Sequence, residues 1–230
     1  MRLSTQLLLA LAVLPLAFAG AAHAESAPGA LYAVTYVEVA SASATNGAAL
    51  LRQYRDAVRK QAGNERTEVA EEIGRPNRFV ILEIWKDQAA LDAHGKDAGT
   101  IALRDKLKAI KLAPSDERVH SALAVGPNAA IGAKRAVFAV SHVDVPAARK
   151  DDAIAILNPL AEVSRKSEGN VRFEVVQQTN RPNHFGVIEA WKDRPAYDAR
   201  GSRAAQKQFR DKLGPMLGAL YDERLYRALD

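Results

Sequence analysis

The sequence predicts an α+β protein that contains two tandem copies of one domain, and three observations support this prediction. The chain matches itself without a gap when it is shifted by about 106 residues, and about 37 of 94 aligned positions are then identical. Within each copy, stretches of alternating polar and apolar residues indicate strands. Segments with apolar residues at helical spacing lie between these stretches and indicate amphipathic helices.

Short motifs mark the repeat. They are Gly-Asn at 63 and 169, Arg-Pro-Asn at 75 and 181, Glu-x-Trp-Lys-Asp at 83 and 189, and Arg-Asp-Lys-Leu at 104 and 210. We expect a first domain at residues 25–125 and a second at residues 137–230. Residues 126–136 are the expected linker, because this segment is rich in Gly, Ala, Pro and Asn.

The first half of each copy is expected to be a strand, a helix and a second strand. Residues 31–39, and 137–145 in the second copy, alternate as a half-buried strand does. Residues 47–62 place apolar side chains at helical spacing. Gly63 and Asn64 end this helix, because both residue types tolerate a left-handed backbone. A second strand follows at residues 66–73.

The second half of each copy completes the pattern. The Arg-Pro-Asn motif indicates a turn, since Pro fixes φ and Asn suits turn positions. A third strand at residues 78–86 precedes two helices at residues 88–94 and 98–110, and a last strand covers residues 117–125. The order β-α-β-β-α-β is the ferredoxin-like arrangement.

Composition excludes several classes of protein. The net charge of +5 comes from 32 basic and 27 acidic residues without a block of Lys and Arg, so we do not expect nucleic-acid binding. The absence of cysteine excludes disulfides, thiolate metal sites and a Cys nucleophile. The sequence also lacks a P-loop, a dinucleotide-binding Gly motif and a Gly-x-Ser-x-Gly motif. We therefore expect no metal and no nucleotide cofactor.

The first 24 residues have the pattern of a signal peptide. Arg2 supplies a positive charge, and an apolar run at residues 7–19 is too short for a typical membrane span. Small residues at Ala22 and Ala24 suit a cleavage site. We expect a periplasmic or secreted protein that begins near Glu25 and has no stable membrane anchor.

The end of the third strand and the helix after it resemble a known protein family. The strand end, Glu83-Ile84-Trp85-Lys86-Asp87, is followed by a helix with Ala90-Leu91 and a terminal His94. This ordered set resembles the antibiotic biosynthesis monooxygenase (ABM) family. Members of that family dimerise through their sheets into an α+β barrel. The resemblance therefore implies that the two ferredoxin-like domains pack as an intramolecular pseudo-dimer, a pseudo-dimeric α+β barrel.

The resemblance also implies a reaction and its reactants. Oxygenases of the family use no metal, flavin or haem, and they deprotonate a quinol or aromatic phenol whose anion reacts with molecular oxygen. His94 matches the family histidine and is the candidate catalytic base. Arg200 stands at its place in the second copy and could stabilise an anion but not accept a proton. We therefore expect activity to reside in the first copy.

Five further residues are candidates for contact with the substrate. Trp85 and Glu83 share one face of a strand, and Trp191 has the same place in the second copy. Tyr36 and its counterpart His142 could orient a substrate. All of these residues also have structural explanations, such as core packing, ion pairing or a helix-end histidine.

Two other functions stay open. A periplasmic small-ligand-binding or scaffold protein could have kept the fold and lost the chemistry, and the change from His94 to Arg200 favours such decay. Haem degradation, known for related folds, is disfavoured because its specific Asn, Trp and His set cannot be placed in this sequence.

Overall fold

The computed structural model describes residues 29–128, 131 and 135–229. The expected signal peptide, residues 1–24, lies outside the described residues, as do parts of the expected linker. The elements of the first copy are β1 (Leu31–Glu38), α1 (Ala44–Val58), β2 (Asn64–Glu72), β3 (Arg78–Trp85), α2 (Gln88–Lys96), α3 (Ala98–Lys108) and β4 (Asp116–Ala124). Those of the second copy are β5 (Val137–Asp144), α4 (Lys150–Arg165), β6 (Asn170–Gln178), β7 (His184–Trp191), α5 (Arg194–Arg200), α6 (Ala204–Leu213) and β8 (Asp222–Ala228).

Short 3₁₀ turns precede α1 (Ser41–Ser43) and α4 (Ala147–Arg149) and follow α6 (Gly214–Met216). Within the described part of the chain, no helix is long and apolar enough to cross a bilayer.

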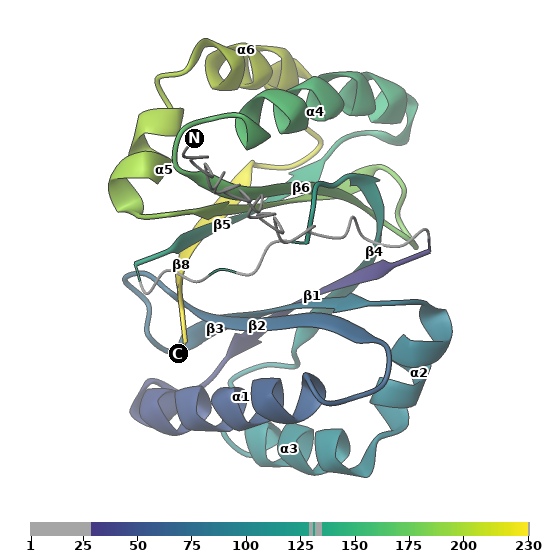
Figure 1. Cartoon of the computed structure of the whole chain (residues 1–230), viewed down its shortest axis with the longest axis vertical. Helices are drawn as coiled ribbons and strands as arrows, with labels where there is room; N and C mark the ends of the chain where they lie inside the picture. The colour runs from purple at the N-terminus through teal and green to yellow at the C-terminus, as the bar shows by residue number, and fades with distance from the viewer. Residues whose placement is uncertain (1–28, 129–130, 132–134, 230) are drawn as a thin grey trace, which may run out of the picture.

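The eight strands form one closed barrel in the order β1-β3-β2-β8-β5-β7-β6-β4. Figure 1 shows the sheets of the two copies facing each other, with helices covering the outer face of each. The sheets are also joined at both edges. Ala70 of β2 pairs with Ala228 of β8, and His120 of β4 pairs with Gln178 of β6. The intramolecular pseudo-dimer expected from the sequence is therefore confirmed, and hydrogen-bonded strands close it on both sides.

Strand alternation divides the apolar residues among three cores. Inward-facing residues such as Val34, Leu82 and Ile188 fill the barrel. Outward-facing residues of the first sheet, Ile81 among them, pack under α1 and α3. A matching outer core lies under α4 and α6 of the second copy. Because side chains alternate along β3, Glu83 and Trp85 share the face of Ile81. They therefore face the helices rather than the barrel interior.

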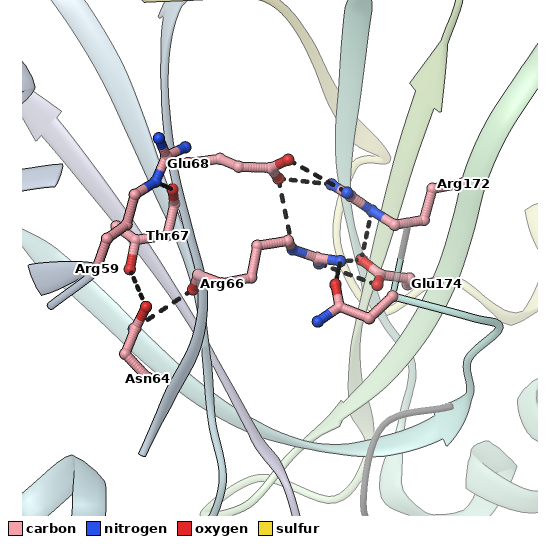
Figure 2. Close-up of polar contacts among 8 residues, drawn as sticks. Arg59, Asn64, Arg66, Thr67, Glu68, Arg172 and Glu174 are labelled. Atoms are coloured by element: carbon pink, nitrogen blue, oxygen red, sulfur yellow. Dashed lines mark hydrogen bonds and ion pairs between the residues drawn. The ribbon is translucent and has the colours of Figure 1, made fainter. Parts of the chain in front are cut away.

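An ionic cluster of four residues lies inside the barrel, where the two copies meet (Figure 2). Arg66 of β2 donates to both carboxylate oxygens of Glu174 at 2.9 and 2.7 Å, and Arg172 of β6 donates to Glu68 at 3.2 and 2.6 Å. The repeat places Arg66 at the position of Arg172 and Glu68 at that of Glu174. The cluster is thus a pseudo-symmetric set of two cations and two anions, and its formal charges cancel.

The repeated motifs have structural roles at the ends of elements. Gly63 has φ +78°, and a Cβ there would lie 2.5 Å from the Cβ of Ala90, so the turn before β2 requires glycine. Asp87 caps α2 by accepting from the backbone N–H of Ala90 at 2.8 Å. Asn77 donates its amide to the backbone oxygen of Val39 at 3.0 Å. The Glu-x-Trp-Lys-Asp motif therefore ends a strand and begins the helix that carries His94.

Candidate functional site

A cavity of about 220 Å³ lies in the first copy, between the outer face of the sheet and the helices α1 and α3. Val37, Ile81 and Leu107 supply apolar walls. The polar lining comes from the strands, both helices and the loop after α3, and consists of Thr35, Tyr54, Arg104, Lys111, Ser115 and Glu117. An aromatic ring would find apolar walls here and a few convergent polar groups, which is the usual make-up of a small-molecule site.

The hydroxyl of Tyr54 connects this cavity to a buried polar pair. Tyr54 donates to Oε1 of Glu83 at 3.1 Å and lies 2.9 Å from Nε2 of His94. Nε2 of His94 and Oε1 of Glu83 are 3.9 Å apart. Glu83 is 4 % and His94 2 % exposed, so both stand behind Tyr54 rather than in the cavity.

Hydrogen bonds fix the tautomer of His94. Its Nδ1 lies 2.7 Å from Oε1 of Gln61, whose amide nitrogen donates to Thr100 at 2.9 Å. Because that amide oxygen can only accept, Nδ1 carries the proton and Nε2 has the lone pair. Nε2 therefore accepts from Tyr54 or from Nη2 of Arg104, which lies 3.1 Å away. The ring of Trp85 packs against the imidazole with centroids 4.5 Å apart.

Burial sets the protonation of this cluster. It raises the pKa of Glu83 to about 7, against the opposing effect of the hydrogen bond from Tyr54. It lowers the pKa of His94 to about 4, and the positive charge of Arg104 acts in the same direction. It also raises the pKa of Tyr54 far above its usual value. At neutral pH, His94 is thus neutral, Tyr54 keeps its proton, and Glu83 is poised to gain or lose one.

The equivalent place in the second copy is occupied by a network of ion pairs and hydrogen bonds. Arg200 lies 3.0 Å from Glu189 and 2.6 Å from Glu223. The hydroxyl oxygen of Tyr221 lies 3.1 Å from Oγ of Ser141 and 3.2 Å from Oε2 of Glu223, and its one proton can be donated to either. Tyr221 replaces Ser115 of the first copy and Ser141 replaces Thr35, so this side chain spans the region that the first cavity leaves open.

The second copy also lacks the relay of the first. Leu160 stands at the position of Tyr54, so no hydroxyl links its buried carboxylate to a ligand. The indole N–H of Trp191 donates instead to Glu189 at 2.8 Å. Burial raises the pKa of Glu189 to about 7, as it does for Glu83, but Arg200 and Trp191 are the partners of Glu189. The two halves of the molecule therefore differ in the groups that contact the buried carboxylate.

The chain resembles known proteins in both sequence and fold. The model of the family described as antibiotic biosynthesis monooxygenase matches residues 30–101 and 136–212, once in each half of the barrel. The chain belongs to the antibiotic biosynthesis monooxygenase family. A protein of Bacillus subtilis strain 168, named "Putative monooxygenase YcnE", is 38% identical over 58 residues. That match covers 25% of the ABM chain and 61% of the length of the relative.

Solved structures of similar proteins support the fold of this tandem ABM chain. A Fusobacterium nucleatum protein, described as a "Putative monooxygenase", superposes with a TM-score of 0.80 at 15% identity. The superposition covers 88% of this chain and 93% of the Fusobacterium chain. A Lactobacillus acidophilus protein gives a TM-score of 0.73 at 12% identity, covering 88% and 95%. At such identities the likeness concerns the fold alone.

Two candidate residues lie elsewhere in the ABM barrel. The ring of Tyr36 faces the barrel interior, between the guanidinium groups of Arg118 and Arg224, at 5.3 and 5.2 Å from its centroid. Nε2 of His142 lies 3.1 Å from Nδ1 of His184 at the same end of the barrel. The structure therefore brings Glu83, Trp85 and His94 together but separates Tyr36 and His142 from them.

The cavity contains ABM residues that the sequence patterns did not single out as functional. Tyr54 lies in the helix expected at residues 47–62, Arg104 begins one of the repeated motifs, and Glu117 begins the last expected strand, and none of these patterns indicates a function. One signal was available, because Tyr54, Lys111 and Ser115 are replaced by Leu160, Leu217 and Tyr221 in a repeat that conserves Arg104 and Glu117. Among the residues that the structure describes, no group of three or more His, Asp or Glu is placed to hold a metal ion.

Proposed function

We propose that this chain is a cofactor-independent monooxygenase that acts on a quinol or another electron-rich phenol in the cavity of its first copy. The observation that carries the proposal is the contact of Tyr54 with Glu83, which links a small, partly apolar cavity to a buried carboxylate with a pKa near neutrality. A general base works best when its pKa is close to the working pH.

The proton passes from the substrate through Tyr54. A bound phenol donates its proton to the oxygen of Tyr54 while Tyr54 passes its own proton to Glu83 across their 3.1 Å hydrogen bond. Arg104 lines the cavity and stays charged, so it stabilises the substrate anion. The high pKa of Tyr54 means that both transfers occur together, without a free tyrosinate.

His94 is the weaker proton acceptor in this cluster. Burial and the positive charge of Arg104 lower its pKa to about 4, whereas burial raises the pKa of Glu83 to about 7. Under this proposal His94 is a positioning residue, because its Nε2 accepts from Arg104 at 3.1 Å while the hydroxyl of Tyr54 donates to Glu83. The family resemblance implies instead that His94 is the direct base, and this stays a prediction. Separate variants of Glu83 and His94 would show which of the two residues accepts the proton.

The oxygen chemistry balances without a cofactor. The carbon beside the ionised hydroxyl of the quinol forms a bond to O₂, and Glu83 returns its proton through Tyr54 to the resulting peroxide. The O–O bond then breaks, water leaves, and the remaining oxygen becomes a carbonyl. The sum is quinol plus O₂ giving hydroxyquinone plus water. The quinol ring supplies all four electrons, so no external reductant is needed.

Oxygen uptake by chelator-treated protein tests this function. With a panel of benzo- and naphthohydroquinones, the wild-type protein is expected to consume oxygen faster than buffer alone. The matched variant is Ser115→Tyr, which carries the residue of the second copy. It should fill the cavity and abolish uptake, while circular dichroism and the melting temperature stay normal.

Three outcomes contradict the proposal. If no quinol supports oxygen uptake by the wild-type protein, the chain is instead a non-catalytic ligand-binding protein of the same fold. If uptake survives in Ser115→Tyr, the reaction does not occur in this cavity. If chelation abolishes uptake, the reaction is not cofactor-independent.

We further propose that the enzyme works outside the cytoplasm, on the strength of its N-terminal sequence. Arg2, the apolar run at residues 7–19 and the small residues before Glu25 support a cleaved signal peptide. Expression of the full chain in a Gram-negative host, followed by osmotic shock and N-terminal sequencing, is expected to give a soluble periplasmic product that begins near Glu25. A product retained in the cytoplasm with its first 24 residues intact would contradict export.

A further inference from the structure

The lining of the first cavity contains a lysine, Lys111, that has no carboxylate partner among the residues that the structure describes. Nζ of Lys111 donates to the hydroxyl of Ser115 at 2.9 Å, and both residues line the cavity. The carboxylate of the lining, Glu117, lies 3.8 Å from Nη2 of Arg104 instead. The lining therefore contains two cations and one anion, and an anionic ligand would balance its charge.

The backbone that carries Lys111 is fixed to the end of β1. Ala40 donates its N–H to the oxygen of Ile110, and Leu112 donates to the oxygen of Glu38, both at 3.0 Å. The N–H of Lys111 itself donates to Leu107 at 3.1 Å. Backbone hydrogen bonds thus fix the segment that carries the ammonium group. Because this segment is already ordered, less conformational entropy is lost when the ammonium group binds a ligand.

The second copy shows that this pair accompanies the open cavity. Lys111 and Ser115 are replaced there by Leu217 and Tyr221, while Arg104, Leu107 and Glu117 keep their identities as Arg210, Leu213 and Glu223. The second copy, where Tyr221 spans the equivalent site, therefore has neither the ammonium group of Lys111 nor the small hydroxyl side chain of Ser115.

We propose that Lys111 and Ser115 form a subsite for the carboxylate of an aromatic acid, so that the ligand of this cavity is a hydroxylated one- or two-ring aromatic carboxylate. The ammonium group has N–H groups left after its bond to Ser115, and the hydroxyl of Ser115 can donate its own proton. Together they match the two oxygens of a carboxylate. At about 220 Å³ the cavity is smaller than the roughly 300–1,000 Å³ of sites for drug-sized ligands, which favours one or two fused rings.

Only the hydroxyl group of the predicted ligand rests on the proposed function. The carboxylate subsite can be tested without turnover. The probes are 2-naphthoate and its neutral isostere naphthalene-2-carboxamide, neither of which has a phenol to oxidise. Calorimetric titration of the mature protein is expected to show at least tenfold tighter binding of the acid. Lys111→Met should remove that preference and leave binding of the amide unchanged.

The matched control is Lys108→Met, which removes the same charge from an exposed position of α3 that does not line the cavity. It should keep the preference for the acid. A wild-type protein that binds acid and amide equally, or neither, overturns the subsite, and so does a preference that survives in Lys111→Met. A preference lost equally in both variants also overturns it, because net charge would then explain the effect.

Turnover separates this inference from the proposed function. With a dihydroxynaphthoate as substrate, Lys111→Met is expected to raise KM about tenfold and leave kcat unchanged, because the carboxylate is bound equally in the ground and transition states. Lysine-dependent binding of naphthoate without any oxygen uptake would sustain the subsite and refute the oxygenase. Oxygen uptake that depends on Glu83 but not on Lys111 would do the reverse.

Discussion

Glu83 shows how position on a strand sets the chemistry of a carboxylate. It lies on the outer face of β3, covered by the helices, and only 4 % of its surface is exposed. Neither Arg104 nor His94 forms a close ion pair with it, since the nearest cationic candidate, Nε2 of His94, is 3.9 Å away and neutral. Burial therefore prevails over charge pairing, and it raises the pKa of Glu83 to about 7.

We predict that Glu83→Gln lowers kcat/KM by about 10²- to 10⁴-fold, because a general base contributes roughly this factor. In the wild-type protein the rate should rise as the pH increases through about 7, since Glu83 accepts a proton only when ionised and is protonated below its pKa. The variant should lack this rise. The measurement is oxygen uptake between about pH 5.5 and 9 with one phenolic substrate.

The matched control for this prediction is Glu189→Gln, which changes the equivalent residue of the second copy and should preserve both rate and pH profile. Circular dichroism must show that both variants are folded. A Glu83→Gln protein with the wild-type profile would exclude Glu83 as the base. If His94→Ala instead removes the rise near pH 7 while Glu83→Gln retains it, the role implied for His94 by the family resemblance is restored.

At the scale of elements, the sequence predicted the strands and helices to within a few residues. Alternation and turn residues were sufficient, because each strand has one face in the barrel and one under helices. The main differences are at helix ends. The first helix spans Ala44–Val58 rather than residues 47–62, because the chain leaves the helix at Arg59 and makes tight turns before Gly63. The helical spacing alone could not locate that exit.

The candidate site was less predictable than the fold, for a physical reason. Glu83, Trp85 and His94 belong to one continuous segment, so a motif found them together. Tyr54 and Arg104 come from different helices, and their meeting depends on how α1 and α3 rotate against the sheet. The interpretation of Tyr36 and His142 as possible site residues depended on the face of β1 and β5 that meets a ligand. In the structure Tyr36 and His142 lie on the face that lines the barrel interior, whereas the candidate cavity lies on the outer face of the sheet.

At the scale of the whole molecule, the four-residue cluster of Figure 2 links the two copies. Its members are between 2 % and 9 % exposed, apart from Glu174, which is fully buried. Removal from water is costly for each charge, and the cost is offset only while every charge keeps its partners. The cluster therefore favours one register of β2 against β6 across the barrel, since a shift of either strand would separate cations from anions.

We predict that Arg172→Met lowers the free energy of unfolding by about 3–5 kcal/mol, because it leaves two buried carboxylates with one guanidinium. Adding Glu68→Leu to this variant should recover part of the loss, since the formal charges then cancel again. Urea denaturation of the two single variants and the double variant gives the coupling. Lys207→Met, which breaks an exposed ion pair with Asp211, is the control and should leave the midpoint almost unchanged.

The opposite result would change the account of this cluster. If Arg172→Met costs no more than Lys207→Met, water enters the barrel and screens the charges, so the cluster contributes little to stability. If the double variant loses the full sum of the two single losses, the side chains act independently and do not select the register.

The place of β8 in the barrel has a consequence for the chain during its synthesis. β8 is the last described strand, and its pairing of Ala228 with Ala70 joins positions about 158 residues apart. Such distant pairings form slowly, because a long loop must close before any contact compensates for the lost entropy. Until β8 has left the ribosome, β2 lacks its outer neighbour and the barrel cannot close. A nascent chain is thereby kept short of its final shape until its last described strand is free to pair with β2.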